Sequence, residues 1–495
     1  MASRVPLPAD FSKPVTASSR LPTCKVGRYS HARGGLFRRP LSLCNPVQYY
    51  HLCNELTKSW VTIAQHVSGT ALSATTPEFK QTGRAINGKR SQGDRPELAK
   101  NTRLGRRYIL ETDISRFYPS IYTHSVPWAL HSKATAKSNR SMALCGNRLD
   151  LLIRMGQDQQ TVGIPIGPDT SLVFAELIMQ RCDDELLSKL PGLKGHRFID
   201  DYELSFFSRT DAENAYHILE ACLSEYELAL NAKKTRVHEL PLPLEATWAT
   251  RLKAFPFDGR HSSQSAELSH YFNLAFELHS ANPTDSVLQF GIGRLRSLRV
   301  DEGNWPAFQK LLLLCVIPEP ASFPYVLEQI VKAKNDGVSL LLGEIEEIAN
   351  SLIVSHSRLK HSSEVATAAW ACLALGLKLH AEAVDEICQC DDPVVALLAL
   401  DCEQNGLVAK PLDKTMWLSH MTQESLYDEN WLLSYEANIK GWLPSSQQGD
   451  HVRADPNFAF LKSNGVYFYD QGLGAVPPTA QVPLPTLPSV STYGY

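Results

Sequence analysis

The chain has 495 residues, a length typical of two to four domains with well-buried cores. Hydrophobic residues make up 43% of it and charged residues 20%, which excludes a largely disordered protein. The longest strongly apolar stretch without charge, residues 365–377, is too short to span a bilayer, and the N-terminal segment MASRVPLPADFSKP lacks the apolar region of a secretory signal. We therefore expect a cytoplasmic protein with no membrane partner.

Basic residues are concentrated near the N-terminus. Residues 1–107 contain 18 Lys and Arg against 5 Asp and Glu, a net charge of +13, so the total of −3 leaves −16 for the remaining residues. This asymmetry predicts that the N-terminal part faces a polyanion, the alternative being a basic, partly disordered arm. Eleven cysteines without a CxxC pair argue against a zinc site or a disulfide framework and favour a reducing compartment.

The N-terminal quarter predicts one helix between two irregular segments. The first 40 residues are rich in Pro, Ser and Arg with little periodicity, so they predict an arm or an irregular layer. Residues 47–67 have apolar residues at helical spacing. Residues 80–107 hold nine basic residues, two acidic ones and four glycines, and predict a flexible basic loop region and not a stable helix.

The next part of the chain alternates strands and helices. Residues 108–114 (YILETDI) predict a strand that ends at SRFYPS, and residues 171–190 predict an amphipathic helix. Residues 196–207 (HRFIDDYELSFF) predict a hairpin around an acidic turn, and residues 211–230 a further helix. This order indicates a mixed sheet covered by helices, an α+β arrangement.

From about residue 262 the pattern becomes helical. Residues 339–355, 364–380 and 393–405 predict amphipathic or apolar helices, stacked in irregular pairs because no strict repeat period is present. After Asp470 the chain has no charged residue and is rich in proline, so we expect an extended or disordered tail.

Two acidic positions predict a metal site. Asp113 ends an apolar strand, and Asp200 and Asp201 lie at the turn of the predicted hairpin, flanked by apolar residues. Adjacent carboxylates are costly unless a cation neutralises them. With a third carboxylate from another strand they form the cage that two-metal phosphoryl transfer needs. Taken alone, an Asp-Asp pair is more often a solvent-exposed hairpin tip; the surrounding strands favour the metal site.

Two further segments carry weaker signals. The loop QTVGIPIGPDTS, residues 160–171, contains Gly163, Pro165 and Gly167 and precedes a helix, so its backbone can approach a ligand closely. Lys234, in LNAKKT, is placed to reach a pyrophosphate leaving group as a charge clamp or proton donor. A solvated basic helix end explains this lysine equally well.

These segments, in this order, resemble a known family. YILETDISRFYPSIYTH, GIPIGP, FIDDY and LNAKKT look like palm motifs A, B, C and D of reverse transcriptases, over about residues 100–240, with a weaker likeness at 39–56. THSVPWALHSKATAK and FAFLKSNGVYFYD are similar to bacterial defence reverse transcriptases of the abortive-infection class, the AbiA and AbiK type and the B subunit of type 3 defence-associated systems. The resemblance implies an RNA-directed or template-limited DNA polymerase acting in antiphage defence in a bacterial cytoplasm.

The resemblance also implies a domain order. The fold class is α+β, with reverse-transcriptase fingers and palm, the right-hand polymerase arrangement, followed by an all-α C-terminal domain. We expect an N-terminal arm and basic fingers at 1–107 and a palm with motifs A to D at 108–260. A helical domain at 261–450 and a segment with an uncharged Pro-rich tail at 451–495 would follow.

Residue roles follow from the same resemblance. Asp113 and Asp200 would hold two Mg²⁺ ions, with Mn²⁺ as an alternative, Asp201 would support them, and Ile114 would add a carbonyl ligand. Tyr118 matches the aromatic gate that disfavours a ribose 2′-hydroxyl, with Phe117 as the competing position. The remaining expected roles are catalysis by Lys234, substrate contacts by Gly163, Pro165 and Gly167, and phosphate contacts by Arg103 and Arg107.

Two positions depart from the family pattern, and the altered GIPIGP loop argues against a retron or group II intron-like enzyme. Phe198 replaces the Tyr of the YxDD signature, and Ile166 stands where many members have Gln. A retron or group II intron-like enzyme, and a catalytically idle scaffold binding partners through its helical domain, are the competing interpretations. The expected partners are dNTPs and an RNA or DNA template. A noncoding RNA, a second reverse transcriptase subunit and a homo-oligomer are further hypotheses.

Priming is a separate hypothesis. Abortive-infection enzymes of this type can start DNA on one of their own side chains, and such a primer needs a hydroxyl on a mobile segment. The hydroxyl groups proposed for this role are at Ser18, Ser19, Tyr29, Ser30, Tyr493 and Tyr495.

Overall fold

The computed structural model describes residue 11 and residues 22–80, 83–257, 262–446 and 449–471. Its largest sheet is antiparallel, with the strand order β6-β7-β5-β8. These strands are Tyr108–Asp113 (β5), Lys194–Phe198 (β6), Asp201–Phe206 (β7) and Arg236–Glu239 (β8). The predicted strand at 108–114 and the predicted hairpin at 196–207 are thus confirmed, and they are neighbours in one sheet.

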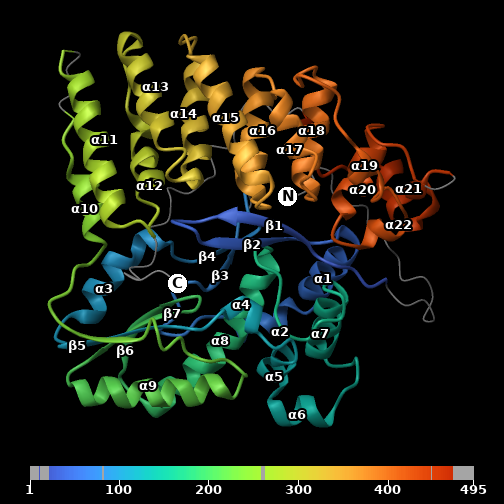
Figure 1. The fold of residues 1–495 in the computed structure, drawn as a ribbon. Helices are drawn as coiled ribbons and strands as arrows, with labels where there is room; N and C mark the ends of the chain where they lie inside the picture. Colours follow the sequence, from blue (N-terminus) through green and yellow to red (C-terminus); the bar gives the residue numbers. More distant parts are fainter. Residues whose placement is uncertain (1–10, 12–21, 81–82, 258–261, 447–448, 472–495) are drawn as a thin grey trace.

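Two helices cover one face of this sheet. They are α8 (Asp169–Lys189) and α9 (Arg209–Ser224), which also pack against each other (Figure 1). Strand alternation directs Leu110 and Leu204 into the core on this side, where both are fully buried. The opposite face carries the acidic residues of β5 and β7, because Glu111 pairs with Glu203 and Asp113 with Asp201.

The segment at 80–107 is more ordered than the sequence predicts. It contains β4 (Ile86–Gly88), which pairs with β3 (Pro77–Phe79), and the helix α3 (Arg95–Arg103). The prediction of a flexible loop without a stable helix was therefore wrong. Pro96 in the first turn favours helix initiation, and ion pairs from both ends of α3 to β7 hold the helix on the acidic face of the sheet.

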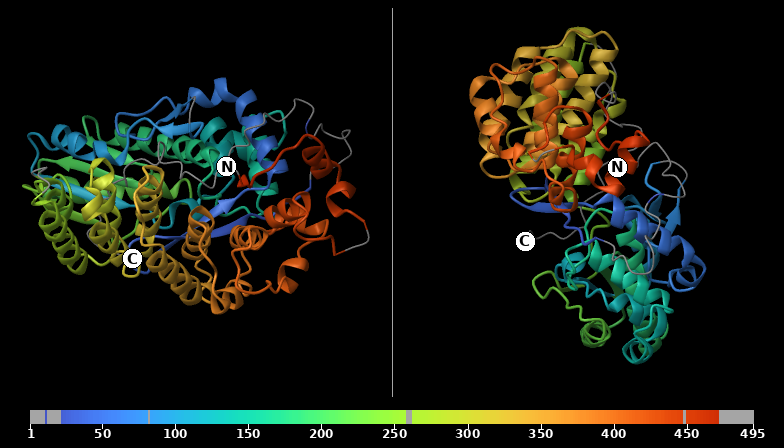
Figure 2. Two further views of the ribbon diagram at one scale, coloured as in Figure 1. Left: turned by 90° about the horizontal axis from the view of Figure 1, so that it is seen from above. Right: turned by 90° about the vertical axis from the view of Figure 1, so that its right-hand side faces the viewer.

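The N-terminal region is also ordered where an irregular arm was predicted. Strands β1 (Gly27–Ala32) and β2 (Arg38–Leu43) form a hairpin between the sheet and the C-terminal helices (Figures 1 and 2). The amides of Ser30 and Ala32 donate hydrogen bonds to Ser362 Oγ (3.1 Å) and Ser363 Oγ (2.8 Å). Contacts more than 300 residues distant in sequence therefore stabilise this hairpin, and no local pattern predicts them.

This order bears on the priming hypothesis. The Tyr29 side chain packs against the helical core, and Ser30 Oγ accepts a hydrogen bond from Arg38 Nε (2.6 Å). Both residues lie in a paired strand and not in the irregular arm that the sequence predicts, and priming at either hydroxyl stays an untested prediction. Ser18, Ser19, Tyr493 and Tyr495 lie outside the described residues, as does the predicted Pro-rich tail from residue 472.

A group of helices packs beside the sheet on the side of α8. The helix predicted at 47–67 is confirmed and breaks at Ser59 into α1 (Pro46–Lys58) and α2 (Trp60–Ala64). The other helices of this group are α4 (Phe117–Ser120), α5 (Ser125–His131), α6 (Lys133–Ser138) and α7 (Cys145–Met155). Their buried faces join α8 and the sheet in one hydrophobic core.

The C-terminal half forms a row of helices above the hairpin (Figures 1 and 2). The row begins with α10 (Thr247–Ala254), α11 (Gln264–Ala281), α12 (Val287–Arg294), α13 (Trp305–Leu314) and α14 (Phe323–Asn335). It continues with α15 (Leu342–Ser357), α16 (Ser362–Leu375), α17 (Ala381–Ile387) and α18 (Pro393–Gln404). The last helices are α19 (Thr415–Leu418), α20 (Trp431–Ile439), α21 (His451–Ala454) and α22 (Pro456–Ser463).

This helical array has its own core. Residues from Trp248 to Val466 form one continuous buried cluster, which Phe11 and Val47 join from the N-terminal part. The molecule is therefore an α+β unit followed by an all-α array, as predicted. None of the described helices combines the length and the apolar character that a membrane crossing requires.

Candidate active site

The register of the sheet brings the three predicted acids together. Asp113, the last residue of β5, lies directly opposite Asp201, the first residue of β7. The Ile114 amide donates a hydrogen bond to the Asp200 carbonyl (3.2 Å). The strand from motif A and the turn from motif C therefore end side by side, although about 90 residues separate them in sequence.

The turn before Asp200 has a strained backbone. Ile199 has a φ of +57°, a conformation that is rare for a β-branched residue and costs roughly 1–3 kcal/mol. Two hydrogen bonds maintain it: Arg197 Nη1 donates to the Ile199 carbonyl (2.8 Å), and the Ile199 amide donates to Thr75 Oγ1 (3.0 Å). This conformation determines the direction of the backbone at Asp200, in the turn between β6 and β7.

A buried ion-pair network lies beneath this turn. The fully buried Arg197 guanidinium contacts Glu176 Oε1 (3.0 Å) and Asp183 Oδ2 (2.8 Å), both on α8. Tyr202 donates its hydroxyl hydrogen bond to Asp183 Oδ1 (2.7 Å), and Thr75 Oγ1 donates to Glu176 Oε1 (2.6 Å). The turn that carries Asp200 thus rests on a buried polar network between the sheet and α8.

Sequence reasoning missed this support, although a signal existed. Glu176 and Asp183 are seven residues apart, so they lie on the same face of a helix, and that face is otherwise apolar. Arg197 stands in the apolar strand next to the acidic turn. Buried charges require partners, and one arginine with two acids would have satisfied that requirement.

The electrostatics of the acids are unusual. Burial, together with the charges of Asp201 and Asp113, raises the pKa of Asp200 to about 8. Burial also raises the pKa of Asp113 to about 6, where the Lys234 ammonium acts in the opposite direction and Asp201 adds to the rise. Ionising all three carboxylates at this strand end is therefore unfavourable without an added cation.

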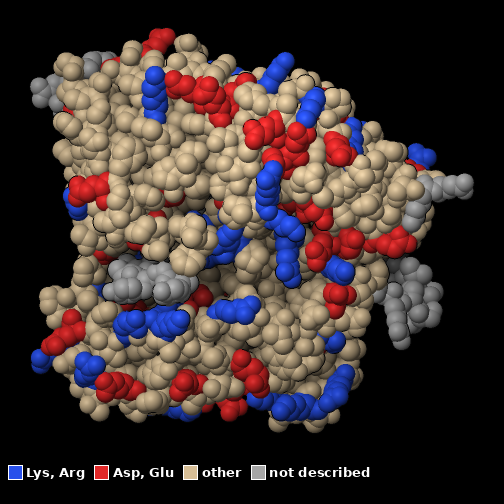
Figure 3. Space-filling view, viewed as in Figure 1, with Lys and Arg blue, Asp and Glu red and all other residues tan. Residues whose placement is uncertain are grey.

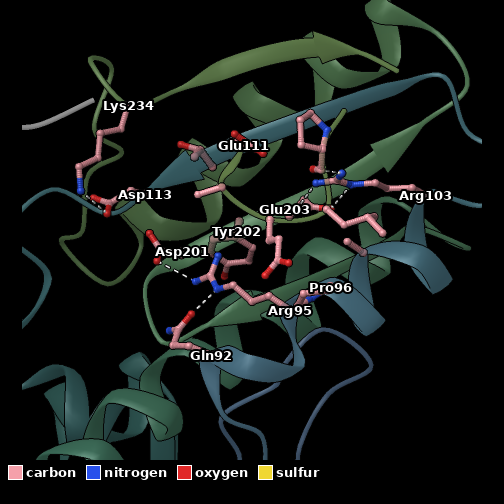
Figure 4. A pocket seen from close by; sticks show the side chains of 16 residues that line it. Gln92, Arg95, Pro96, Arg103, Glu111, Asp113, Asp201, Tyr202, Glu203 and Lys234 are labelled. Carbon is pink, nitrogen blue, oxygen red and sulfur yellow. Dashed lines mark hydrogen bonds and ion pairs between the residues drawn. The ribbon is translucent and has the colours of Figure 1, made fainter. Parts of the chain in front are cut away.

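Two cations lie against this cluster (Figure 4). Lys234 Nζ is 2.8 Å from Asp113 Oδ2, and Arg95 Nη2 is 2.9 Å from Asp201 Oδ2. The Arg95 guanidinium also stacks over the Phe198 ring, with its carbon 4.5 Å from the ring centroid. Lys234 was predicted at this site, whereas Arg95 was not, because nothing local in the sequence indicates that α3 crosses the sheet here.

The cluster fits hard divalent cations. Mg²⁺ binds through one or two carboxylates at each ion, and Asp113, Asp200 and Asp201 supply three within one strand end. Burial, followed by the charges of the neighbouring carboxylates, raises the pKa of Asp113 and Asp200, so the ionised carboxylates are unfavourable here until a cation binds them. Asp113, Asp200, Asp201 and the carbonyl of Ile114 are the residues that would hold them.

The predicted loop at 160–171 packs against motif A. The Gly163 amide donates to the Ile121 carbonyl (2.8 Å), and the Ile164 amide to the Tyr118 carbonyl (2.9 Å). Gly163 has a φ of +92°, and a Cβ there would lie 3.2 Å from the Pro119 carbonyl oxygen, so a side chain would strain this contact. The loop is thus fixed close to the gate position.

The rest of the loop leads into α8. The Pro165 carbonyl accepts a hydrogen bond from Ser171 Oγ (2.6 Å), and the Gly167 carbonyl one from Arg84 Nη2 (2.6 Å). Arg84 also pairs with Asp169 in the first turn of α8. A substrate contact by Gly163, Pro165 and Gly167 stays a prediction; the loop that contains them packs against residues 118–121 of motif A.

The two candidates for the aromatic gate have different environments. Phe117 is 2% exposed and belongs to the core beneath the sheet. Tyr118 is only partly buried, and burial and then the charge of Asp200 raise the pKa of its hydroxyl above the usual value. Of the two rings, Tyr118 is the one placed beside the acids.

The predicted phosphate ligands Arg103 and Arg107 have carboxylate partners. Arg103 forms a two-pronged ion pair with Glu203, with both nitrogen–oxygen distances at 2.8 Å, and lines the cleft shown in Figure 4. Arg107 is exposed and pairs with Glu239 (2.8 Å). The structure brings together Asp113, Asp200, Asp201 and Lys234, whereas Arg103 and Arg107 lie further along the sheet and are neutralised there.

Comparison with known proteins agrees with this geometry. The family model described as reverse transcriptase (RNA-dependent DNA polymerase) matches residues 37–265. No curated protein matches the chain. Among solved structures, the telomerase from Candida albicans in complex with the TWJ fragment of telomeric RNA is similar at 12% identity and a TM-score of 0.23, over 52% of this chain and 49% of that one. This structural likeness is too distant to support a conclusion.

The family match covers β2, the central sheet, α8, α9 and each of the acids described above. Residues 37–265 of this protein form a reverse transcriptase domain, the catalytic domain of RNA-dependent DNA polymerases, which are nucleotidyltransferase enzymes.

Proposed function

We propose that this protein is a reverse transcriptase that adds deoxynucleotides to a growing strand by two-metal catalysis. The observation that carries the proposal is the pairing of Asp113 with Asp201 in the register of the sheet, beside the strained turn that presents Asp200. A reverse transcriptase domain with all three carboxylates at one strand end argues against a catalytically idle scaffold. The substrates would be dNTPs and an RNA or DNA template.

The residues have distinct roles in this proposal. Mg²⁺ ions bound here would activate the attacking hydroxyl oxygen and stabilise the charge of the leaving pyrophosphate. Asp113 and Asp200 hold the ions, with Asp201 and the Ile114 carbonyl in support. Tyr118 lies beneath the sugar of the incoming nucleotide and excludes a 2′-hydroxyl. Lys234, which is bound to Asp113 in the free protein, donates a hydrogen bond or a proton to the pyrophosphate.

The biological role we propose is antiphage defence of the abortive-infection class. The segments that resemble that class, THSVPWALHSKATAK and FAFLKSNGVYFYD, lie in α5 and α6 and around α22. The helical array that follows the catalytic domain matches the domain order of the same class. A noncoding RNA, a second reverse transcriptase subunit or a second copy of this chain are the partners that the class suggests.

The activity is tested by an incorporation assay. Purified protein with Mg²⁺ should incorporate labelled dNTPs on poly(rA)·oligo(dT) and incorporate NTPs much less. Asp113→Ala and Asp200→Ala should each abolish incorporation, because each change removes a ligand of the ions, and their thermal unfolding should stay cooperative. Wild-type-like incorporation by either variant would refute the two-metal assignment. Phage plating on cells that express wild-type protein or Asp113→Ala then tests the defence role.

A further inference from the structure

Arg103 and Arg107 are each paired with a carboxylate of the sheet, and Lys234 and Arg95 are paired with the acids themselves. Cations that lack such a partner are therefore further candidates for binding the triphosphate of an incoming nucleotide. Two arginines of the β1–β2 hairpin, Arg33 and Arg39, are exposed and form no ion pair with a carboxylate among the described residues. Figure 3 shows Lys and Arg side chains in the hollow between the helical array and the sheet unit, the level at which Figure 1 places the hairpin.

The hairpin register puts these arginines on one face. Arg39 lies opposite His31, so their side chains share a face, and Arg33 follows His31 by two residues on that same face. Arg38 lies opposite Ala32 and therefore points to the other side.

The other face is attached to the helical array. Arg38 binds Glu364 of α16 with both prongs of its guanidinium, Nη1 to Oε1 at 2.5 Å and Nη2 to Oε2 at 2.7 Å, and Glu364 is almost fully buried. At the hairpin tip, a Cβ on Gly34 would lie 2.2 Å from the Thr284 carbonyl oxygen, so the backbones touch. The array thus determines where the free face of the hairpin lies.

The base of the hairpin is attached to the motif B loop. The Ser42 amide donates to the Ile166 carbonyl (2.8 Å), and the Ile166 amide donates to Ser42 Oγ (3.1 Å). The Leu41 side chain reaches the position where a Cβ of Gly167 would lie (3.9 Å). The hairpin is therefore held rigidly beside the loop that borders Tyr118.

The arginines lie within electrostatic range of the active site. Although Arg33 keeps an exposed surface, partial desolvation and the charge of Arg39 lower its pKa, while the charges of Asp200, Asp201 and Asp113 oppose this change. Arg39 acts on Tyr118, which the charge of Asp200 also affects. The gate, the acids and the two free guanidinium groups thus surround one space, with negative charge on the sheet side and positive charge on the hairpin side.

We infer that Arg33 and Arg39 bind the triphosphate of the incoming nucleotide, and that Glu364, acting through Arg38, positions them. This inference rests on the proposed polymerase function. In the proposed function, the sugar of the incoming nucleotide lies over Tyr118 and its ions lie at Asp113 and Asp200. The triphosphate of that nucleotide would then extend toward the β1–β2 hairpin. Guanidinium groups bind phosphate oxygens through two parallel hydrogen bonds, and neither arginine has to break an ion pair with a carboxylate of the described residues first.

The test separates nucleotide contacts from strand contacts. Steady-state kinetics would use dTTP with poly(rA)·oligo(dT) for wild type, Arg33→Ala, Arg39→Ala, the double variant and Arg209→Ala. Arg209 is a matched control because it is exposed and pairs with Glu213 on α9. Each hairpin variant should raise KM for dTTP by about tenfold, the loss expected for a charge-assisted hydrogen bond. The kcat and the KM for the template-primer should change less than threefold, and Arg209→Ala should behave as wild type.

Two results would overturn the inference. One is a KM for dTTP within twofold of wild type in the double variant. The other is a rise confined to the KM for poly(rA)·oligo(dT), which would assign the arginines to strand phosphates. Because both arginines are exposed, the variants should unfold at the wild-type temperature.

A binding measurement separates this inference from the proposed function. Wild-type protein should bind dTTP more tightly than dTMP, and the double variant should lose that preference. If the wild-type protein prefers dTTP and the double variant does not, but the wild-type protein incorporates no nucleotide, the binding site is supported and the polymerase function is refuted. If the wild-type protein incorporates dTTP but the double variant still prefers dTTP over dTMP, the polymerase function is supported and the arginine site is refuted.

The positioning role of Glu364 has its own readout. Glu364→Gln removes the charge that Arg38 binds, so KM for dTTP should rise by an intermediate factor with little change in kcat. Glu364→Asp, which keeps the charge, should restore part of the affinity. An equal loss in both variants, or a loss of kcat alone, would contradict a role through Arg38.

Discussion

Phe117 and Tyr118 are neighbours in sequence but have different surroundings, and this difference makes sugar selection testable at single residues. Tyr118→Ala should raise incorporation of rUTP relative to dTTP, because the ring beside Asp200 no longer excludes the 2′-hydroxyl. Phe117→Ala should leave that ratio unchanged and lower the free energy of unfolding by about 3–5 kcal/mol, since its ring is buried. The ratio of the two incorporation rates and denaturant unfolding are the measurements. A changed ratio in Phe117→Ala alone would place the gate one residue earlier.

The raised pKa values of Asp113 and Asp200 predict a pH-dependent response to Mg²⁺. The ordinary pKa of an Asp carboxyl is 3.8, and in the fold burial, together with the neighbouring carboxylates, raises the pKa of Asp113 to about 6 and that of Asp200 to about 8. Between these values the folded state binds more protons than the unfolded state, so their contribution to stability falls as pH rises from about 4 to about 8. Mg²⁺ binds the deprotonated groups, so it should raise the melting temperature more at pH 8 than at pH 6.

Thermal unfolding with and without Mg²⁺ at the two pH values checks this. Other groups also titrate, so the matched comparison is the variant Asp113→Asn/Asp200→Asn, in which both the pH trend and the Mg²⁺ effect should shrink. An equal Mg²⁺ effect at both pH values in the wild type would contradict the raised pKa values.

At the scale of elements, the motif B loop is held against motif A by its glycine. Gly163→Ala adds a Cβ that must tolerate a φ of +92° and a contact of 3.2 Å with the Pro119 carbonyl. Gly192 is a matched control, because its φ of +78° imposes strain while no atom lies within 4 Å of its added Cβ. Both changes should cost roughly 1–3 kcal/mol from backbone strain. Only Gly163→Ala should also lower incorporation, since it displaces Pro119 beside Tyr118. Equal activity of the two variants would show that the loop does not fix the gate.

Elements with local signals were the ones that the sequence predicted. The strand at 108–113, the hairpin at 194–206 and the helix after Gly167 have periodic apolar residues, and their acids lie where the motifs placed them. The β1–β2 hairpin and α3 lack such a pattern. Contacts with residues that are distant in sequence stabilise them, namely Ser362, Ser363, Asp201 and Glu203. For the same reason the sequence identified the acids but not Arg33, Arg39 or Arg95, which depend on tertiary packing.

At the scale of the whole molecule, the helical array and the reverse transcriptase domain share the hairpin as a common element. Trp431 Nε1 donates to the Leu43 carbonyl (3.0 Å), and Asn45 Nδ2 donates to the Leu426 carbonyl (2.8 Å), so the end of β2 and the start of α1 are held by the last third of the chain. The array therefore contributes to the position of the hairpin beside the motif B loop. A change in the array can alter nucleotide affinity without touching the acids.

The charge asymmetry of the chain predicts where nucleic acid binds. Lys89 and Arg90 follow β4 and are exposed, and they belong to the N-terminal part that carries a net charge of +13. Each phosphate contact to a single strand contributes about −0.7 to the slope of log affinity against log salt concentration. The variant Lys89→Ala/Arg90→Ala should therefore bind a labelled oligonucleotide more weakly and reduce the magnitude of that slope by up to about 1.4.

The matched control is Arg251→Ala/Lys310→Ala, because these exposed cations lie on the acidic helical array and pair with Glu277 and Glu344. Titrations at several salt concentrations decide: an unchanged slope in the first variant, or an equal reduction in the control, would mean that the basic N-terminal part does not provide the nucleic-acid surface.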